Sequence, residues 1–144
     1  MLRVVPYEAE HLDRLDLQEA QAYLQGCIAP ELRKALECPY SYTGLDGDRV
    51  VCCAGLIPFW EGRAMAWAYL AQDVAPRNFV VLNKMVKRFL DACPFERVEA
   101  YVDENFENGH RWVKALGFEL EAPKMRKFRD GGTCAMYARV RENG

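Results

Sequence analysis

The sequence lacks the features that mark membrane, secreted and nucleic-acid-binding proteins. No apolar run approaches the ~18–20 residues needed to cross a bilayer, and residues 1–6 lack the long apolar core of a secretory signal. The 19 basic and 21 acidic residues leave a formal charge of −2, whereas a compact nucleic-acid-binding protein is usually clearly basic. These absences predict a cytoplasmic protein with no nucleic-acid partner and no membrane partner.

Cysteine and histidine are present, but without the spacing of a disulfide framework or a metal site. The two histidines, His11 and His110, are far apart, and no cysteines show C-x-x-C spacing. Cys52 and Cys53 are adjacent within an apolar run, where neighbours point to opposite faces of a strand. We therefore expect reduced thiols in the core and no bound metal. The cysteines are Cys27, Cys38, Cys52, Cys53, Cys93 and Cys134.

The composition is that of an ordinary globular domain. The 144 residues are 51% hydrophobic, 28% charged and 12% aromatic, which excludes a disordered chain. A chain of this length buries roughly 68–70% of the surface that its unfolded form exposes, so it needs no disulfides to fold. Because no repeat, linker or low-complexity tract interrupts the sequence, we expect a single domain over residues 1–144.

Hydrophobic periodicity predicts strands and helices in the order βααβββαβαββ. The expected strands are 2–7, 40–45, 49–57, 63–71, 97–102, 118–122 and 133–140, and the expected helices are 9–24, 30–36, 79–93 and 108–116. Asp46-Gly47-Asp48 is a hairpin turn, and Gly26 and Gly117 end helices. A meander followed by strand–helix–strand implies an α/β (α+β) fold. We expect a mixed, mostly antiparallel sheet of about seven strands with helices on both faces.

Local motifs add a resemblance to a known family. The segment Asn108-Gly109-His110-Arg111-Trp112-Val113-Lys114-Ala115-Leu116-Gly117-Phe118 resembles the end of the fourth helix in the GNAT superfamily, which has the acyl-CoA N-acyltransferase fold. The hairpin of residues 42–57, with Gly55, is similar to that family's second and third strands. The likeness is closest to short acetyltransferase-like proteins of tailed phages, in which an H-x-R-W-L-x-x-L-G-F pattern recurs and a Trp-containing strand, here Ala66-Trp67-Ala68-Tyr69-Leu70, precedes the third helix. The resemblance covers nearly the whole chain and implies acetyl-CoA as cosubstrate.

The resemblance places the CoA pyrophosphate at the start of the third helix, where backbone amides and the helix dipole favour negative charge. The family motif Q/R-x-x-G-x-G/A aligns with Gln72-Asp73-Val74-Ala75-Pro76-Arg77. Pro76 removes an amide, and Arg77 replaces a glycine or alanine. Arg77 with Asn78 either makes charge-assisted contacts to phosphate or lies beside a decayed loop, a reading that the acidic Asp73 favours. The implied CoA-binding residues are Leu70, Ala71, Gln72, Ala75, Arg77, Asn78, Asn108 and Trp112, although Trp112 also fits a core aromatic.

The catalytic part of the resemblance is incomplete. Many family members place a tyrosine four residues before the glycine of the helix end, where its hydroxyl can protonate the leaving thiolate. In this chain that position is Val113. Glu99, Tyr101 and Asp103 alternate with apolar residues and therefore share one strand face. Glu99 or Tyr101 is the candidate proton acceptor, although a solvent-facing strand has the same pattern. His110, in the first turn of its helix, either reaches a ligand, caps the helix or is solvated.

Two segments outside these motifs are open to more than one interpretation. The basic run 124–129 is interspersed with Met125 and Phe128. We interpret it as a solvated hairpin arm rather than an RNA site, since it is short and the net charge is negative. Phe59 and Trp60 occupy an expected turn over 58–62. There they cover a substrate groove, join a subunit interface or fold back onto the sheet.

Two functions are compatible with the sequence. The first is an acetyl-CoA-dependent N-acetyltransferase that acts, as a monomer or homodimer, on an amine of a small molecule or peptide. The second is a non-catalytic GNAT-like module that serves as a phage structural or interaction protein, with virion proteins as partners and the virion as its location. The replaced glycines and Val113 favour the second function, and the fold alone does not decide between them.

Overall fold

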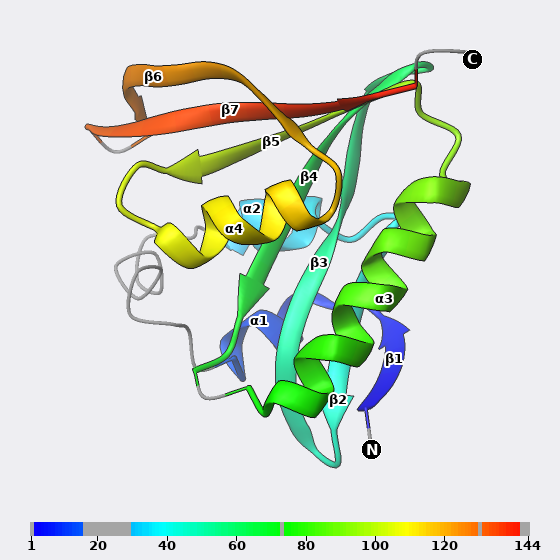
Figure 1. The fold of residues 1–144 in the computed structure, drawn as a ribbon. Helices are drawn as coiled ribbons and strands as arrows, with labels where there is room; N and C mark the ends of the chain where they lie inside the picture. Colours follow the sequence, from blue (N-terminus) through cyan, green and yellow to red (C-terminus); the bar gives the residue numbers. More distant parts are fainter. Residues whose placement is uncertain (1, 16–29, 73, 130, 142–144) are drawn as a thin grey trace. The chain divides into compact units, whose positions relative to one another are not determined.

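The computed structural model describes residues 2–15, 30–72, 74–129 and 131–141. Within these residues the element order is βααβββαβαββ, as the sequence predicted. The elements are β1 (Leu2–Pro6), α1 (Ala9–Asp13), α2 (Pro30–Ala35), β2 (Ser41–Asp46), β3 (Arg49–Trp60), β4 (Arg63–Leu70), α3 (Pro76–Ala92), β5 (Arg97–Asp103), α4 (Glu107–Ala115), β6 (Glu119–Arg129) and β7 (Gly132–Val140). The strands form one mixed sheet in the order β1-β2-β3-β4-β5-β7-β6 (Figure 1), which confirms the predicted fold class.

The chain divides into two compact units. The first contains residues 1–57 and 67–88, and the second contains residues 58–66 and 89–144. The boundaries fall within β3, β4 and α3, so these three elements each belong to both units. The two units are described separately below.

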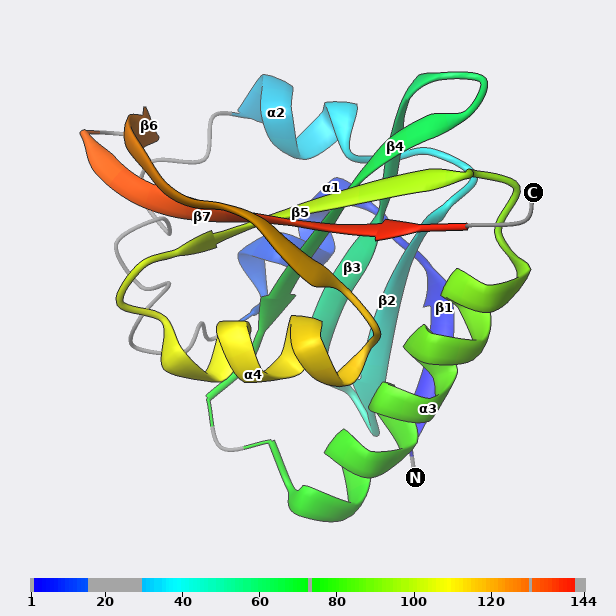
Figure 2. The same cartoon turned by 45° about the horizontal axis from the view of Figure 1, so that its top comes forward.

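The first unit is built on the antiparallel strands β1, β2 and β3. Figures 1 and 2 show α1 on one face of these strands and the first turns of α3 on the other. Gly47 forms the predicted turn between β2 and β3 with φ +63°, a conformation that glycine adopts at no steric cost. The buried core cluster of the first unit consists of Tyr7, Leu12, Leu15, Leu36, Leu45, Val50, Cys53 and Ala71.

The second unit packs α4 against β5, which pairs antiparallel with β7. Gly109 allows this close approach, because a Cβ at this position would lie 2.9 Å from the Val102 side chain and 2.6 Å from Phe106. Gly117 ends α4 with φ +94°. The Phe118 N–H donates to the Val113 carbonyl and the Gly117 N–H to that of Lys114. This is a Schellman arrangement at the helix end that Gly117 was predicted to form.

Several boundaries differ from the prediction because proline is tolerated in strands. β3 continues through Pro58 to Trp60, so the turn is confined to Glu61 and Gly62. β6 continues past Pro123 to Arg129, and its register with β7 shifts between Ala122 and Met125, which accommodates a residue without an N–H. The helix predicted over 9–24 ends at Asp13, because Arg14 is its C-cap in a turn and Leu15 lies outside any helix. Residues 16–24 and Gly26 lie outside the described residues.

The described cysteines are free thiols, as predicted. Cys52, Cys53, Cys93 and Cys134 are buried and Cys38 is half-buried. Burial raises the pKa of Cys52 and raises that of Cys53 to about 12, so both are unreactive thiols at neutral pH. Cys27 lies outside the described residues. In the described part of the chain, no helix combines the length and apolar character that a bilayer crossing requires.

Candidate active site

β4 and β5 are neighbouring strands of the sheet. The two strands run parallel and are paired from Arg63↔Arg97 to Ala66↔Ala100. β4 then continues to Leu70, and β5 continues to Asp103. In open sheets, ligands bind at the carboxyl ends of parallel strands, where the strand order changes direction. The predicted site residues of the first unit follow the end of β4, and those of the second unit lie on β5 and α4.

The segment between β4 and α3 contains most of the predicted CoA-binding residues. Leu70 and Ala71 are buried, and the Ala71 N–H donates to the Val51 carbonyl at 2.9 Å. The Gln72 side chain is exposed, while its carbonyl accepts a hydrogen bond from the Arg49 guanidinium. This segment is therefore attached to β3 by its main chain, and Asp73 lies outside the described residues.

In the first turn of α3, Arg77 is exposed to solvent and Asn78 is buried. α3 begins at Pro76, three residues earlier than predicted, and the Ala75 carbonyl accepts its first hydrogen bond, from Phe79, at 3.0 Å. Arg77 is exposed. Asn78 is 6% exposed, and its side-chain amide donates to Asp46 at 2.9 Å. The Asn78 side chain thus holds α3 against the end of β2.

A buried carboxylate, Glu99, is the centre of a hydrogen-bond network in the second unit. It is 2% exposed. Its oxygens accept hydrogen bonds from Arg63 at 2.6 and 3.0 Å, from Arg97 at 2.8 Å and from the Tyr101 hydroxyl at 2.6 Å. Arg97 also donates to Glu121 at 2.6 and 3.1 Å. The sequence predicted that Glu99 and Tyr101 share a face, and the structure brings their side chains into direct contact.

This network sets the protonation states of the two candidate catalytic residues. The hydrogen bonds from Arg63, aided by those from Tyr101 and Arg97, outweigh burial and hold the pKa of Glu99 at about 2. Burial, and then the hydrogen bond to Glu99, raise the pKa of Tyr101. At neutral pH the pair is a carboxylate and a neutral phenol. A carboxylate with four donors and so low a pKa is a weak proton acceptor.

The arginine partners of Glu99 are the site residues that sequence reasoning missed. Arg97 lies two residues from Glu99 on the same strand, so the alternation that grouped Glu99 with Tyr101 also includes Arg97. Arg63 is 36 residues away in sequence, and only the pairing of β4 with β5 brings it to Glu99. The Arg63 guanidinium also lies 4.6 Å from the Phe59 ring centre and 5.7 Å from that of Trp60.

The remaining predicted residues lie on α4. Asn108 is exposed and accepts a hydrogen bond from Arg111, whereas Trp112 is half-buried. Val113, at the tyrosine position of the resemblance, is 9% exposed. Trp112 and Val113 therefore lie at the packed side of the helix, and Asn108 lies at its open start.

His110 is engaged through both ring nitrogens. Its Nε2 lies 3.3 Å from the Glu104 carbonyl, which can only accept, so Nε2 carries the hydrogen. Its Nδ1 then accepts a hydrogen bond from the Tyr137 hydroxyl at 2.8 Å. Tyr137 is 3% exposed, and burial raises its pKa. Of the alternatives for His110, helix capping is not observed, because Phe106 is the N-cap of α4 and both ring nitrogens of His110 have other partners.

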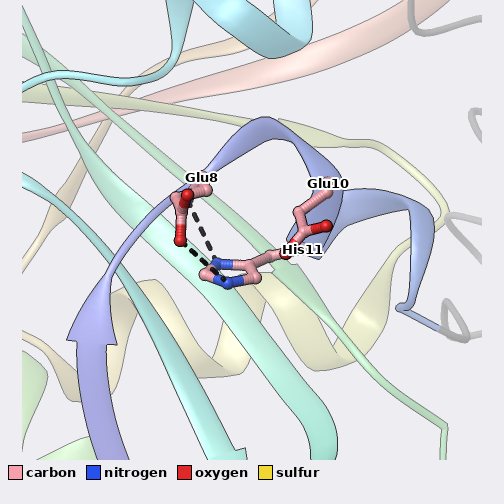
Figure 3. A group of neighbouring side chains, drawn as sticks. All are labelled: Glu8, Glu10 and His11. Carbon is pink, nitrogen blue, oxygen red and sulfur yellow. Dashed lines mark hydrogen bonds and ion pairs between the residues drawn. The ribbon is translucent and has the colours of Figure 1, made fainter.

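A group of possible metal ligands lies at the start of α1 (Figure 3). Side-chain ligand atoms of Glu8, Glu10 and His11 lie within 4.8 Å of one another. The His11 Nδ1 accepts a hydrogen bond from the Glu8 N–H at 3.1 Å and lies 2.9 Å from the Thr43 hydroxyl. The ring hydrogen is therefore on Nε2, 3.8 Å from the Glu8 carboxylate, and leaves no lone pair for a metal. The group caps α1 and attaches it to β2.

The basic run of β6 and the aromatic pair of β3 are both on the surface. Lys124, Arg126, Lys127 and Phe128 are exposed, and the solvated hairpin arm stays a prediction. Phe128 contacts Tyr101, with ring centres 4.9 Å apart. Phe59 and Trp60, which are 44% and 67% exposed, belong to the end of β3 rather than to a turn.

Comparisons with known proteins relate this chain to acetyltransferases by fold. An N-acetyltransferase from Staphylococcus aureus has a TM-score of 0.74 at 9% identity, over 97% of both chains. Ard1 from Thermoplasma volcanium has a TM-score of 0.73 at 16% identity, over 96% of this chain and 97% of its own. An acetyltransferase of the GNAT family from Bacillus cereus has a TM-score of 0.68 at 10% identity, over 98% of both chains. No family model and no curated protein sequence matches the chain. The chain therefore has the fold of these GNAT-family acetyltransferases.

Proposed function

We propose that this protein is an acyl-CoA-dependent N-acetyltransferase that acts on an amine of a small molecule or peptide. The fold shared with acetyltransferases supports this proposal. The observation that carries it is that, within the first unit, the carboxyl end of β4 at Leu70 leads to the start of α3 at Pro76, with Arg77 exposed in its first turn. The start of a helix that follows the carboxyl end of a strand is a place where backbone amides and the helix dipole favour a phosphate.

In this proposal CoA follows the end of β4 and the start of α3. Leu70, Ala71 and Gln72 form the wall beside the pantetheine, and the first amides of α3 face the pyrophosphate. Pro76 has no amide, so the N–H groups of Arg77 and Asn78 are the ones available at this end. The side chain of Arg77 is exposed. Its positive charge compensates for the phosphate contact that the missing amide of Pro76 would have made. Asn78 contributes its main chain alone, because its side chain binds Asp46.

Bound acetyl-CoA supplies an activated acyl group as a thioester. The amine nitrogen bonds to the acyl carbon, the carbon–sulfur bond breaks, and the proton lost by nitrogen balances the thiol that forms. We assign Tyr101 to hydrogen bonding with the reacting groups and Glu99 to holding the Tyr101 hydroxyl. Because the pKa of Glu99 is about 2, Glu99 and Tyr101 orient the reacting groups and do not accept the proton of the amine. Positioning of the two substrates therefore supplies most of the rate enhancement. Asn108 and Trp112 remain proposed CoA contacts.

A non-catalytic role is the second candidate. It is favoured by buried Val113 at the position where the resemblance has a tyrosine, and by Pro76 in place of an amide donor. The phage resemblance extends this candidate to a virion-associated protein. Recovery of the protein in purified phage particles, without any response to CoA, would support this role.

Thermal unfolding with CoA and acetyl-CoA separates the two candidates. A ligand at roughly 100 times its Kd stabilises the folded state by about 2.7 kcal/mol. We expect this stabilisation for the wild type and its loss in Arg77→Glu. Lys84→Glu is the matched control, since it makes the same charge change at an exposed position of α3. No stabilisation of the wild type at millimolar CoA would reject the transferase proposal, and equal stabilisation of both variants would remove Arg77 from the site.

A further inference from the structure

The strand β6, at the end of the sheet beside β7 (Figure 1), carries three cations without a partner among the described residues. Lys124, Arg126 and Lys127 are exposed, and none of them makes a hydrogen bond or an ion pair with another described residue. The arginines of the second unit outside β6 all have acceptors. These are Glu99 for Arg63, Glu99 and Glu121 for Arg97, Asn108 for Arg111, Asp91 for Arg139, and the carbonyls of Leu90 and Asp91 for Arg141. No described residue neutralises the charge of β6.

The backbone of β6 brings these side chains to the surface together. In a regular strand neighbouring side chains point to opposite faces, yet Arg126, Lys127 and Phe128 are all exposed. The cause is an irregularity near the strand end, where the register with β7 shifts after Met125 and Lys127 has φ +52°. This left-handed conformation is unfavourable for a residue with a Cβ, and among the described residues Lys127 is the one non-glycine residue that adopts it. No contact of Lys127 with a described residue offsets this cost, which points to a role outside the fold.

Phe128 adds an apolar surface that is held in place. It is 43% exposed, and its ring centre lies 4.9 Å from that of Tyr101. Tyr101 is itself fixed by the hydrogen bond from its hydroxyl to Glu99 at 2.6 Å. A ring that is already ordered in the free protein loses little conformational entropy when it binds a partner. We call Lys124, Arg126, Lys127 and Phe128 the β6 patch.

The charges at the other end of β6 limit the kind of anion that fits this patch. Glu119 and Glu121 are exposed at the start of the strand. A nucleic-acid backbone carries a charge at every nucleotide, so it would meet these carboxylates as it continued along β6. A peptide instead places a few acidic side chains opposite the cations and an apolar side chain on Phe128. Addition of a long strand is hindered by Pro123 and the register shifts, so recognition is through side chains.

We propose that the β6 patch binds a short acidic segment of another protein. Acidic side chains of that segment pair with Lys124, Arg126 and Lys127, and an apolar neighbour packs on Phe128. The inference goes beyond the proposed function and does not depend on it. All four residues of the patch belong to the second unit, and none of them is assigned to CoA or to acyl transfer.

Fluorescence anisotropy with two labelled peptides tests this inference. One peptide alternates aspartate with leucine, and the other has asparagine in place of aspartate. We expect the wild type to bind the aspartate peptide alone, more weakly at physiological salt than at low salt because exposed charges are screened.

Two variants that remove the same number of charges locate the binding surface. Each exposed ion pair changes affinity by roughly twofold to fivefold, so Lys124→Gln/Arg126→Gln/Lys127→Gln should weaken binding by about tenfold or more. The matched control is Lys84→Gln/Lys87→Gln/Arg88→Gln, which removes three cations from exposed positions of α3. The control should keep the affinity within about twofold, because charges beyond the screening length contribute little.

Lys127→Gly separates binding from folding. Glycine adopts a positive φ at no steric cost, so Tm should not fall, whereas loss of the ammonium group should weaken binding of the aspartate peptide by roughly twofold to fivefold. An unchanged affinity would show that the irregularity only protects the edge of the sheet, and would overturn the inference.

The remaining outcomes are equally decisive. Absence of binding at low salt, equal binding of both peptides, or equal losses for the β6 and α3 variants would each overturn the inference. Tighter binding of a single-stranded DNA oligonucleotide would assign the patch to nucleic acid instead. A wild-type dimer in sedimentation that the β6 variant loses would assign it to a second copy of the chain. Because no sample contains CoA, these results leave the proposed function to its own test.

Discussion

Replacing Glu99 by glutamine tests the network that supports the proposed catalytic face. The variant keeps the shape of the side chain but removes the charge that accepts hydrogen bonds from Arg63, Arg97 and Tyr101. Each hydrogen bond to a charged group contributes about 1.5–3 kcal/mol, and leaving buried charges unpaired costs about 3–5 kcal/mol. The Arg63 and Arg97 side chains are 34% and 30% exposed and regain part of their hydration. We therefore expect a loss of about 2–3 kcal/mol in the free energy of unfolding.

Urea unfolding and thermal scans measure this loss. For a chain of this length, each kcal/mol lowers Tm by about 3 °C, so Glu99→Gln should lower Tm by about 6–9 °C. Glu121→Gln is the matched control, because the Glu121 side chain is 39% exposed and, among the described residues, forms its ion pair with Arg97. Glu121→Gln should lower the free energy of unfolding by less than about 1 kcal/mol. Equal losses for both variants would refute the inference that burial makes the Glu99 network strong.

The pH dependence of this difference provides an independent check. The network lowers the pKa of Glu99 from 4.5 to about 2 in the folded state. The stabilisation is therefore complete above the unfolded pKa of 4.5 and is lost as the pH falls towards 2. We expect the wild type to exceed Glu99→Gln by a constant amount between pH 6 and 7 and by progressively less below about pH 4.5. A difference that stays constant down to pH 3 would refute the assignment to the carboxylate charge.

Other predictions concern close packing, backbone conformation and thiol reactivity. Gly109→Ala should lower the free energy of unfolding by about 1–3 kcal/mol in urea titrations, since its Cβ would lie 2.9 Å from Val102. A loss below 0.5 kcal/mol would mean that α4 is free to move away from β5. Gly117→Ala should cost about 1–2 kcal/mol, because φ is +94°, and Gly117→Asn should recover part of it. Cys52 and Cys53 should react with a thiol reagent in denaturant but not in the native protein at pH 7, given their raised pKa values. Rapid native labelling of either thiol would contradict their burial.

Local sequence signals accounted for most of the fold. The period of apolar residues predicted the order of strands and helices, and Gly47 and Gly117 marked a hairpin turn and a helix end at the correct positions. Strand ends were less predictable at Pro58 and Pro123, because proline stops a strand only where its missing N–H is needed for pairing. The sequence alone does not show which edge of a strand is paired, and so does not show whether the N–H that proline lacks would be needed.

The candidate site was predictable only in part. Alternation along β5 correctly grouped Glu99 with Tyr101, because side chains two residues apart share a strand face. The same reasoning made Glu99 a candidate proton acceptor, whereas hydrogen bonds from Arg63, Tyr101 and Arg97 lower its pKa to about 2. Asn78 was grouped with Arg77 as a CoA contact, but its side chain binds Asp46 across the first unit.

What the sequence determined by itself was local: the periodic burial of side chains, the glycine positions with positive φ, and the face on which each strand residue lies. Contacts between distant segments were decided by the tertiary structure, since β-sheet register is set by pairing between strands. Arg63 reaches Glu99 because Met65, two residues further along β4, is paired with Glu99. The protonation state of the carboxylate, and with it the chemistry available at this face, follows from that register.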